Sequence, residues 1–291
     1  LDFLNDLFQD DKINSAQYEA LIRFTANPED YTNRGSIVTP LKDRIGSQII
    51  THYPHTLSIA KKITKQESDI IQSSVYIPEL AHDLIEEINF AARKSEYVDF
   101  KSGVSARMSI TAFENLVSTA KRRMLINNEE KTSIRLSDFT GVIPAINGKI
   151  ELVYEGEEQG ADQISFNLIN EGVKTIFLRF FPEISKLEKP NEVTPYDKIL
   201  SWFVENGTEL FIGDEFTNKE YQDSLDEIKP LDELVKKYCK EINNEDISFI
   251  KEILLWGLSS FKKLSKNRML DGIEFKDSLG SYLKNLNSDQ I

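Results

Sequence analysis

The chain has 291 residues, is 40% hydrophobic and carries a formal net charge of −13. This length suits about two domains, and the composition is that of a globular protein rather than a disordered one. The excess of acidic side chains disfavours nucleic acid and anionic membranes as partners, because both are negatively charged. A single cysteine, Cys239, excludes an internal disulfide and favours a reducing, cytoplasmic location. No apolar run reaches the roughly 18–20 residues of a membrane span.

Helical periodicity dominates the chain, with apolar side chains recurring every three or four residues, and predicts about eight to ten helices. The strongest patterns cover residues 78–94, 110–126, 163–181, 196–205, 217–228, 231–238 and 249–264. Thr217 and Glu220 predict a capping box, and Pro230 predicts a break after that helix. Strand signals are few, at 19–25 and 132–136, so strands are expected mostly within the first ~35 residues. The predicted fold class is mainly α.

Three polar residues stand out by their order along the chain. Asn27 ends an apolar run, Arg44 follows in a loop, and Arg107 directly precedes a predicted helix. An Asn amide can donate to an anionic oxygen and accept from water, and an Arg guanidinium forks onto phosphate oxygens. Each residue also has an ordinary interpretation, as a turn, a surface ion pair and a helix cap respectively. Their order favours a nucleotide site.

The sequence around these residues resembles the magnesium chelatase subunit I-like and MoxR-like AAA+ ATPases. The resemblance is carried by FTANPEDYTNRG at 24–35, IVTPLKDRIGSQI at 37–49, SGVSARMSI at 102–110 and GVIPAINGKIELVYEGEEQG at 141–160. It implies that Asn27 is the sensor-1 residue, Arg44 the arginine finger and Arg107 the sensor-2 arginine. Arg34 is a further candidate for an inter-subunit contact.

The resemblance also implies an architecture and a function. Residues 1–54 would be the end of an AAA+ α/β core, residues 55–140 a helical lid, and residues 141–291 a helical C-terminal domain. Such ATPases use ATP and Mg²⁺ in homo-oligomeric rings and act on partner proteins that carry a von Willebrand A domain. The expected function is therefore ATP-driven remodelling of a partner protein by a partial AAA+ subunit. The alternative is a non-catalytic helical interaction module derived from an AAA+ protein.

Two parts of the family pattern are missing from the sequence. It contains no phosphate-binding loop of the form Gly-x-x-x-x-Gly-Lys-Ser/Thr, and no Walker B strand ahead of Asn27. The run ELFIGDEF at 209–216 imitates Walker B but lies downstream of sensor 1, so a loop and helix start are expected there. We interpret the chain as the C-terminal portion of a longer ATPase, and expect it to bind no cofactor by itself.

Other chemically suggestive groups have ordinary interpretations. His52 and His55 flank a proline and are expected to be loop histidines rather than zinc ligands, and no metal site is predicted. His82 is expected on a helix face, and Cys239 is expected to be a plain thiol. The acid pairs at 86–87 and 157–158 and the basic run at 121–123 are expected to be solvated.

Overall fold

The computed structural model describes residues 43, 44, 46, 47, 49–70, 74–187, 193–206 and 209–278. The chain divides into two compact units, Leu1–His52 and Tyr53–Ile291. Arg44 belongs to the first unit and is exposed. Asn27, Arg34 and the strand predicted at 19–25 lie outside the described residues. All the named helices and strands belong to the second unit.

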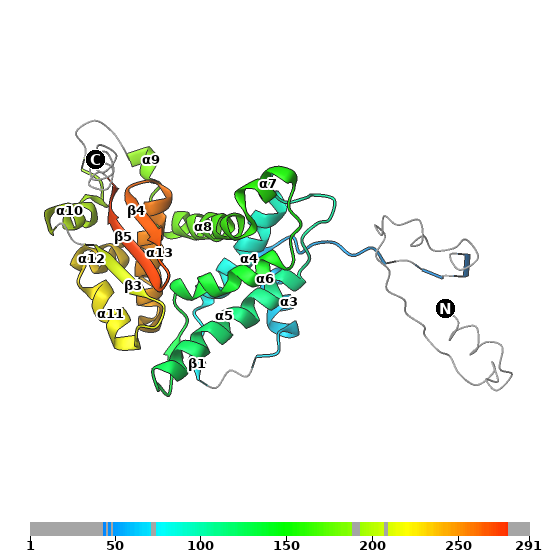
Figure 1. Cartoon of the computed structure of the whole chain (residues 1–291), viewed down its shortest axis with the longest axis horizontal. Helices are drawn as coiled ribbons and strands as arrows, with labels where there is room; N and C mark the ends of the chain where they lie inside the picture. The colour runs from blue at the N-terminus through cyan, green and yellow to red at the C-terminus, as the bar shows by residue number, and fades with distance from the viewer. Residues whose placement is uncertain are drawn as a thin grey trace. The chain divides into compact units, whose positions relative to one another are not determined.

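Helices make up most of the second unit, which confirms the mainly α class (Figure 1). They are α3 (Leu57–Glu67), α4 (Glu79–Lys94), α5 (Arg107–Ile126), α6 (Ile143–Asn147), α7 (Tyr154–Gln159), α8 (Ala161–Phe180), α9 (Ile184–Leu187), α10 (Asp197–Asn206), α11 (Asn218–Asp226), α12 (Lys229–Tyr238) and α13 (Ile247–Ser260), with 3₁₀ turns η1 (Ser137–Val142) and η2 (Asn244–Asp246). The described helices exceed the expected eight to ten, because α6, α7 and α9 are too short to show a repeating apolar stripe.

A strand lies within the segment predicted at 132–136, which confirms that prediction in part, and further strands occur where the periodicity predicted none. β1 (Val75–Tyr76) and β2 (Thr132–Ser133) form a short parallel pair. β3 (Leu210–Gly213), β4 (Leu264–Arg268) and β5 (Gly272–Asp277) form an antiparallel sheet in the order β3-β5-β4. The helix predicted at 249–264 is too long, because α13 ends at Ser260 and the chain then turns into β4.

β3 corrects the interpretation of ELFIGDEF as a loop. Leu210 and Ile212 are buried in this strand, which pairs with β5. The helix start expected after it is confirmed: the Thr217 side chain accepts from the backbone N–H of Glu220, and the Glu220 carboxylate accepts from the backbone N–H of Thr217. The run is therefore an antiparallel strand followed by a capped helix.

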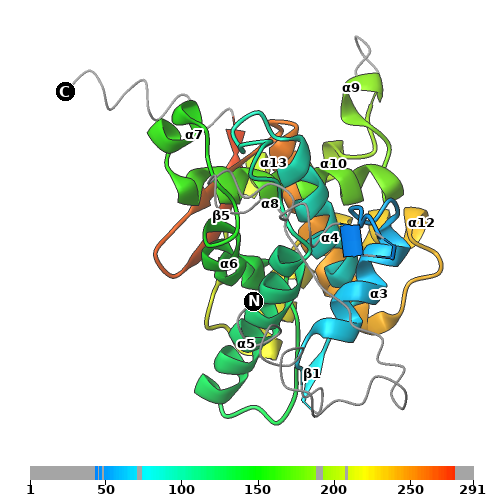
Figure 2. The same ribbon diagram turned by 90° about the vertical axis from the view of Figure 1, so that its right-hand side faces the viewer.

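α8 lies at the centre of the second unit, packed against α4 on one side and α13 on another (Figures 1 and 2). Gly172 of α8 lies against Leu84 and Ile88 of α4, and Gly257 of α13 lies against the ring of Phe177 in α8. A Cβ at either glycine would overlap these side chains. Residues 140 and 141 both belong to the unit Tyr53–Ile291. The division expected between them, into an AAA+ lid and a C-terminal domain, stays a prediction.

Candidate functional site: the loop that carries Arg107

Arg107 is the first residue of α5, and its side chain is exposed. This confirms the position expected for it, at the start of the helix that carries Phe113 and Val117. Its backbone N–H donates to the Ser105 hydroxyl at 3.0 Å. Among the described residues, no side chain pairs with its guanidinium. The guanidinium is therefore available to an anion, at the N-terminus of a helix, whose dipole also favours negative charge.

Side chains of α4 hold the loop that leads into α5, which consists of residues 103–106. The buried Asn89 amide donates to the Ser109 hydroxyl at 2.7 Å and to the Ser105 carbonyl at 3.4 Å. The Arg93 Nε–H donates to the Val104 carbonyl at 3.0 Å. The carbonyls of the successive residues Val104 and Ser105 are therefore held by side chains of α4, and these bonds fix the direction in which α5 begins.

Glu86 corrects the expectation that the acid pair at 86–87 is solvated. Only 3% of Glu86 is exposed, and its carboxylate accepts from the hydroxyls of Thr64 and Ser109. Burial raises the pKa of Glu86. Its partners lie 22 and 23 residues away, so no local pattern could reveal them. Glu86 therefore ties α3 and α5 to α4 directly beneath the Arg107 loop.

His82 lies on the same helix and is more buried than a helix-face position suggests. Its imidazole packs 4.4 Å from the ring of Phe113, centroid to centroid, and burial lowers its pKa to about 4. His82 is therefore neutral at neutral pH. His52 and His55 lie in exposed loop backbone, as expected. Cys239 is buried, which raises the pKa of its thiol to about 11 and makes it a poor nucleophile.

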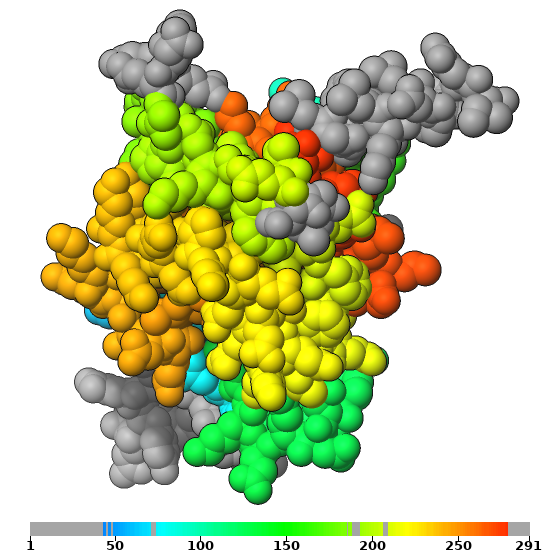
Figure 3. Space-filling model, turned by 90° about the vertical axis from the view of Figure 1, so that its left-hand side faces the viewer, coloured from blue at the N-terminus to red at the C-terminus, as the bar shows by residue number. Residues whose placement is uncertain are grey.

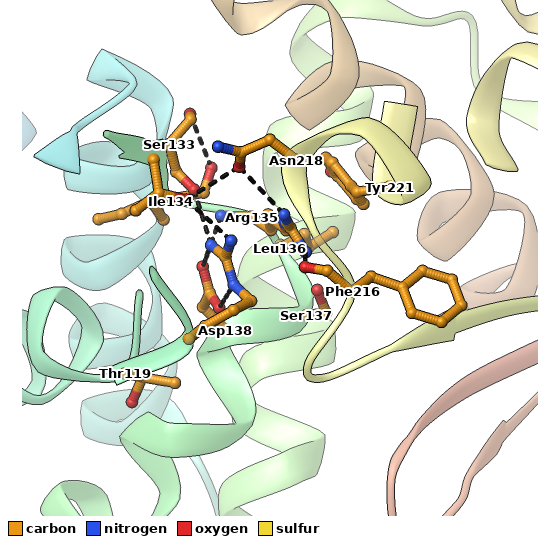
Figure 4. Close-up of polar contacts among 12 residues, drawn as sticks. Thr119, Ser133, Ile134, Arg135, Leu136, Ser137, Asp138, Phe216, Asn218 and Tyr221 are labelled. Atoms are coloured by element: carbon orange, nitrogen blue, oxygen red, sulfur yellow. Dashed lines mark hydrogen bonds and ion pairs between the residues drawn. The ribbon is translucent and has the colours of Figure 1, made fainter. Parts of the chain in front are cut away.

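A second polar cluster lies at the other end of α5 (Figure 4). Arg123, expected on a solvated face, is instead 2% exposed and grips the Asp138 carboxylate with Nε and Nη2 at 3.1 and 2.9 Å. The neighbouring Arg122 is exposed as expected and pairs with Glu215 at 3.3 Å. Figure 3 shows this end of α5, in green, beside α11, in yellow. Two residues of the basic run, Lys121 and Arg122, are thus exposed as expected, and Arg123 is buried.

Arg135 and Glu252 extend this cluster into α11 and α13. The buried Arg135 guanidinium donates to the Asn218 side chain at 3.1 Å and lies 4.5 Å from the ring of Tyr221 (Figure 4). The fully buried Glu252 accepts from the Tyr221 hydroxyl at 2.8 Å and from the backbone N–H of Leu136 at 2.9 Å. Burial lowers the pKa of Arg135 to about 10 and raises that of Glu252 to about 7. Sequence reasoning missed both, because their partners lie 31 to 116 residues away along the chain.

Replacing Glu252 by glutamine is expected to flatten the pH dependence of stability. Because the folded-state pKa of about 7 lies above the ordinary value of 4.5, the folded chain binds the proton more tightly. The free energy of unfolding of the natural chain should therefore fall as pH rises from about 4.5 to 7, by about 3 kcal/mol, and Gln mimics the protonated form. Urea unfolding of both proteins at pH 5 and pH 8 measures this.

The comparison must use the difference between the two proteins. The depressed pKa of His82, about 4, has the opposite effect, since the unfolded imidazole binds its proton more tightly at pH 4 to 6.5. Glu233→Gln, on the surface of α12, is the matched control. Equal pH dependence in the natural chain and the Glu252→Gln variant would show that Glu252 does not titrate abnormally.

The comparisons with known proteins give no match: no family model, no curated protein and no solved structure is similar to this chain. Within the described ranges there is no cluster of three or more potential metal-ligating His, Cys, Asp or Glu residues. No helix there is long and apolar enough to cross a membrane. The candidate site in the second unit thus consists of Arg107 at the start of α5. Arg44 belongs to the first unit and is a separate candidate, exposed in the structure.

Proposed function

We propose that this chain is the arginine-bearing portion of an AAA+ ATPase subunit. In this proposal Arg107 contacts the phosphates of ATP bound by its own subunit, and Arg44 contacts those bound by a neighbour. The observation that supports it is the geometry of Arg107. Its exposed guanidinium belongs to the first residue of α5, directly after a loop held by Asn89 and Arg93. A fixed backbone suits forked recognition of phosphate, because little conformational freedom is lost when the ligand binds.

Two further parts of the site, a phosphate-binding loop and a Walker B acid, would come from sequence outside these 291 residues and would hold ATP and Mg²⁺. Within this chain, Asn27 would orient the attacking water. The resemblance extends the proposal to a homo-oligomeric ring that remodels a protein partner with a von Willebrand A domain. The net charge of −13 makes nucleic acid or an anionic membrane a poor alternative partner.

Replacing Arg107 by lysine in the ATPase that contains this chain is expected to lower turnover by about 10²-fold. The reason is that a single ammonium group cannot form the two parallel hydrogen bonds by which a guanidinium stabilises the charge that develops on the phosphate oxygens. Steady-state ATP hydrolysis measures this. Arg122→Lys is the matched control, since Arg122 is an exposed arginine on the same helix and should tolerate the change. Equal turnover in both variants would remove Arg107 from the site.

The 291-residue chain by itself is expected to show no binding of Mg-ATP at micromolar concentration. The backbone amides and lysine of the phosphate loop supply most contacts to the β- and γ-phosphates, and the sequence contains no such loop. Calorimetric titration checks this, with the longer ATPase as the positive control. Micromolar binding to the chain itself would show that it contains a different phosphate site.

The absence of this loop from the sequence also favours a second candidate, a helical interaction module without a nucleotide role. In that case the bracing of the Arg107 loop would only stabilise the fold. The two candidates differ in one measurement: a module without a nucleotide role would hydrolyse no ATP within its full-length protein, with or without Arg107.

A further inference from the structure

Tyr53 is the first residue of the second unit, directly after the unit that contains Arg44. Half of Tyr53 is exposed, yet its ring lies only 4.1 Å from the carbon at the centre of the Arg93 guanidinium. The ring of Phe90 lies 5.7 Å from the same carbon. Two aromatic rings therefore hold the guanidinium that donates to the Val104 carbonyl.

Tyr53 also reaches the loop directly. Its hydroxyl lies over Gly103, so closely that a Cβ at this position would overlap it. Gly103 has a φ of +68°, which independently favours glycine. Tyr53 thus contacts Gly103 directly, and it holds the Arg93 side chain that donates to the carbonyl of Val104. Ser105 and Arg107 follow immediately.

We infer that Tyr53 is a positioning residue for Arg107, because it holds, through Arg93 and Gly103, the backbone that leads into α5. The role of Arg107 in contacting phosphate rests on the proposed function, but the contacts by which Tyr53 holds the loop before α5 do not. While Tyr53 is stacked, Arg93 is held and the Val104 carbonyl is fixed. When Tyr53 moves away, Arg93 loses one of its two rings, and the space above Gly103 opens. The loop then gains freedom, and α5 no longer presents Arg107 in one direction.

Amide hydrogen exchange in the 291-residue chain tests the link without any nucleotide. The Gly103 N–H donates to the Asp99 carbonyl, and the N–H groups of Arg107 and Met108 donate to the Ser105 hydroxyl and carbonyl, so these three amides report the order of the loop. Tyr53→Ala is expected to speed their exchange about 10-fold, because local opening becomes easier when the bracing contact is lost. Tyr53→Phe keeps the ring over Arg93 and should retain most of the protection. Tyr154→Ala, which removes a more exposed tyrosine from α7, is the matched control.

Two outcomes of this experiment would overturn the inference. One is unchanged exchange of the three amides in Tyr53→Ala. The other is faster exchange throughout α4 and α5 to the same extent, which would indicate general destabilisation. Should Tyr53→Ala fail to fold, Tyr53→Leu keeps apolar bulk without a π face, and the same acceleration confined to the loop is expected.

Turnover of the ATPase that contains this chain separates the inference from the proposed function. If both hold, Tyr53→Ala lowers kcat with little change in KM, and adds little to the loss in an Arg107→Lys background. Loss of activity in Arg107→Lys but not in Tyr53→Ala would overturn the positioning role. Loop-specific exchange together with full activity in Arg107→Lys would overturn the proposed function and leave the link between Tyr53 and the loop intact.

Discussion

Under the proposed AAA+ function, replacing Arg44 by alanine is expected to slow ATP hydrolysis by about 10³-fold or more and to leave nucleotide affinity nearly unchanged. An arginine that reaches into a neighbouring subunit stabilises charge that develops only in the transition state, so its loss affects the chemical step rather than binding. Arg44 is exposed in this structure, which is what such a role requires. Single-turnover hydrolysis and equilibrium nucleotide binding, both measured on the assembled ATPase, test the two halves of the expectation.

Two controls make the Arg44 experiment specific. Mixing the Arg44→Ala protein with a variant defective in the phosphate-binding loop should restore part of the activity, because mixed rings contain some complete sites. Asp43→Ala tests the ordinary interpretation, in which Arg44 only forms a surface ion pair with its neighbour. If Asp43→Ala is as slow as Arg44→Ala, or if mixing restores nothing, the trans-acting role is wrong.

Replacing Arg123 by alanine is expected to lower the free energy of unfolding by about 3–5 kcal/mol. Arg123 and Asp138 are 2% and 4% exposed, and their side chains form two hydrogen bonds at 3.1 and 2.9 Å. Removing the guanidinium leaves a buried carboxylate without its counter-charge. Urea unfolding of the second unit, followed by circular dichroism, measures the loss. Arg122→Ala is the matched control and should change stability by no more than about 0.5 kcal/mol, since its ion pair is exposed.

The double variant Arg123→Ala with Asp138→Ala should be more stable than the sum of the two single losses indicates, because it leaves no unpaired charge. Recovery will be partial, since the Asp138 carboxylate also accepts from the backbone N–H of Arg135 at 2.8 Å. A loss below about 1 kcal/mol in Arg123→Ala would show that the pair contributes little to stability.

The sequence predicts those features that depend on neighbouring residues. α4, α5 and α8 begin and end within a few residues of their predicted bounds, because each repeats its apolar stripe over several turns. The capping box of Thr217 and Glu220 is a local signal and is confirmed. The position of Arg107 at the start of α5 is confirmed for the same reason: the helix that follows it is strongly periodic.

Features that depend on distant residues could not be predicted in this way. Glu86 and Arg123 look solvated in sequence, since charged side chains on helices usually are, and only their partners in other elements reveal that they are buried. The β4–β5 hairpin has short strands with few apolar residues, and β3 pairs with β5 across about 60 residues. The nucleotide role of Asn27 and Arg44 depends on groups from other segments and stays a prediction.

The glycine contacts of α8 have a mechanical consequence. The backbone of α8 at Gly172 contacts side chains of α4, and the backbone of α13 at Gly257 contacts a side chain of α8. At neither glycine is there space for a methyl group. Such packing has low compressibility and transmits strain. α8 has 20 residues and is therefore about 30 Å long. Together with α4 and α13 it forms a stiff three-helix block, which joins the β4–β5 hairpin, with its exposed tip at Met269 and Leu270, to the helix that holds the backbone before Arg107.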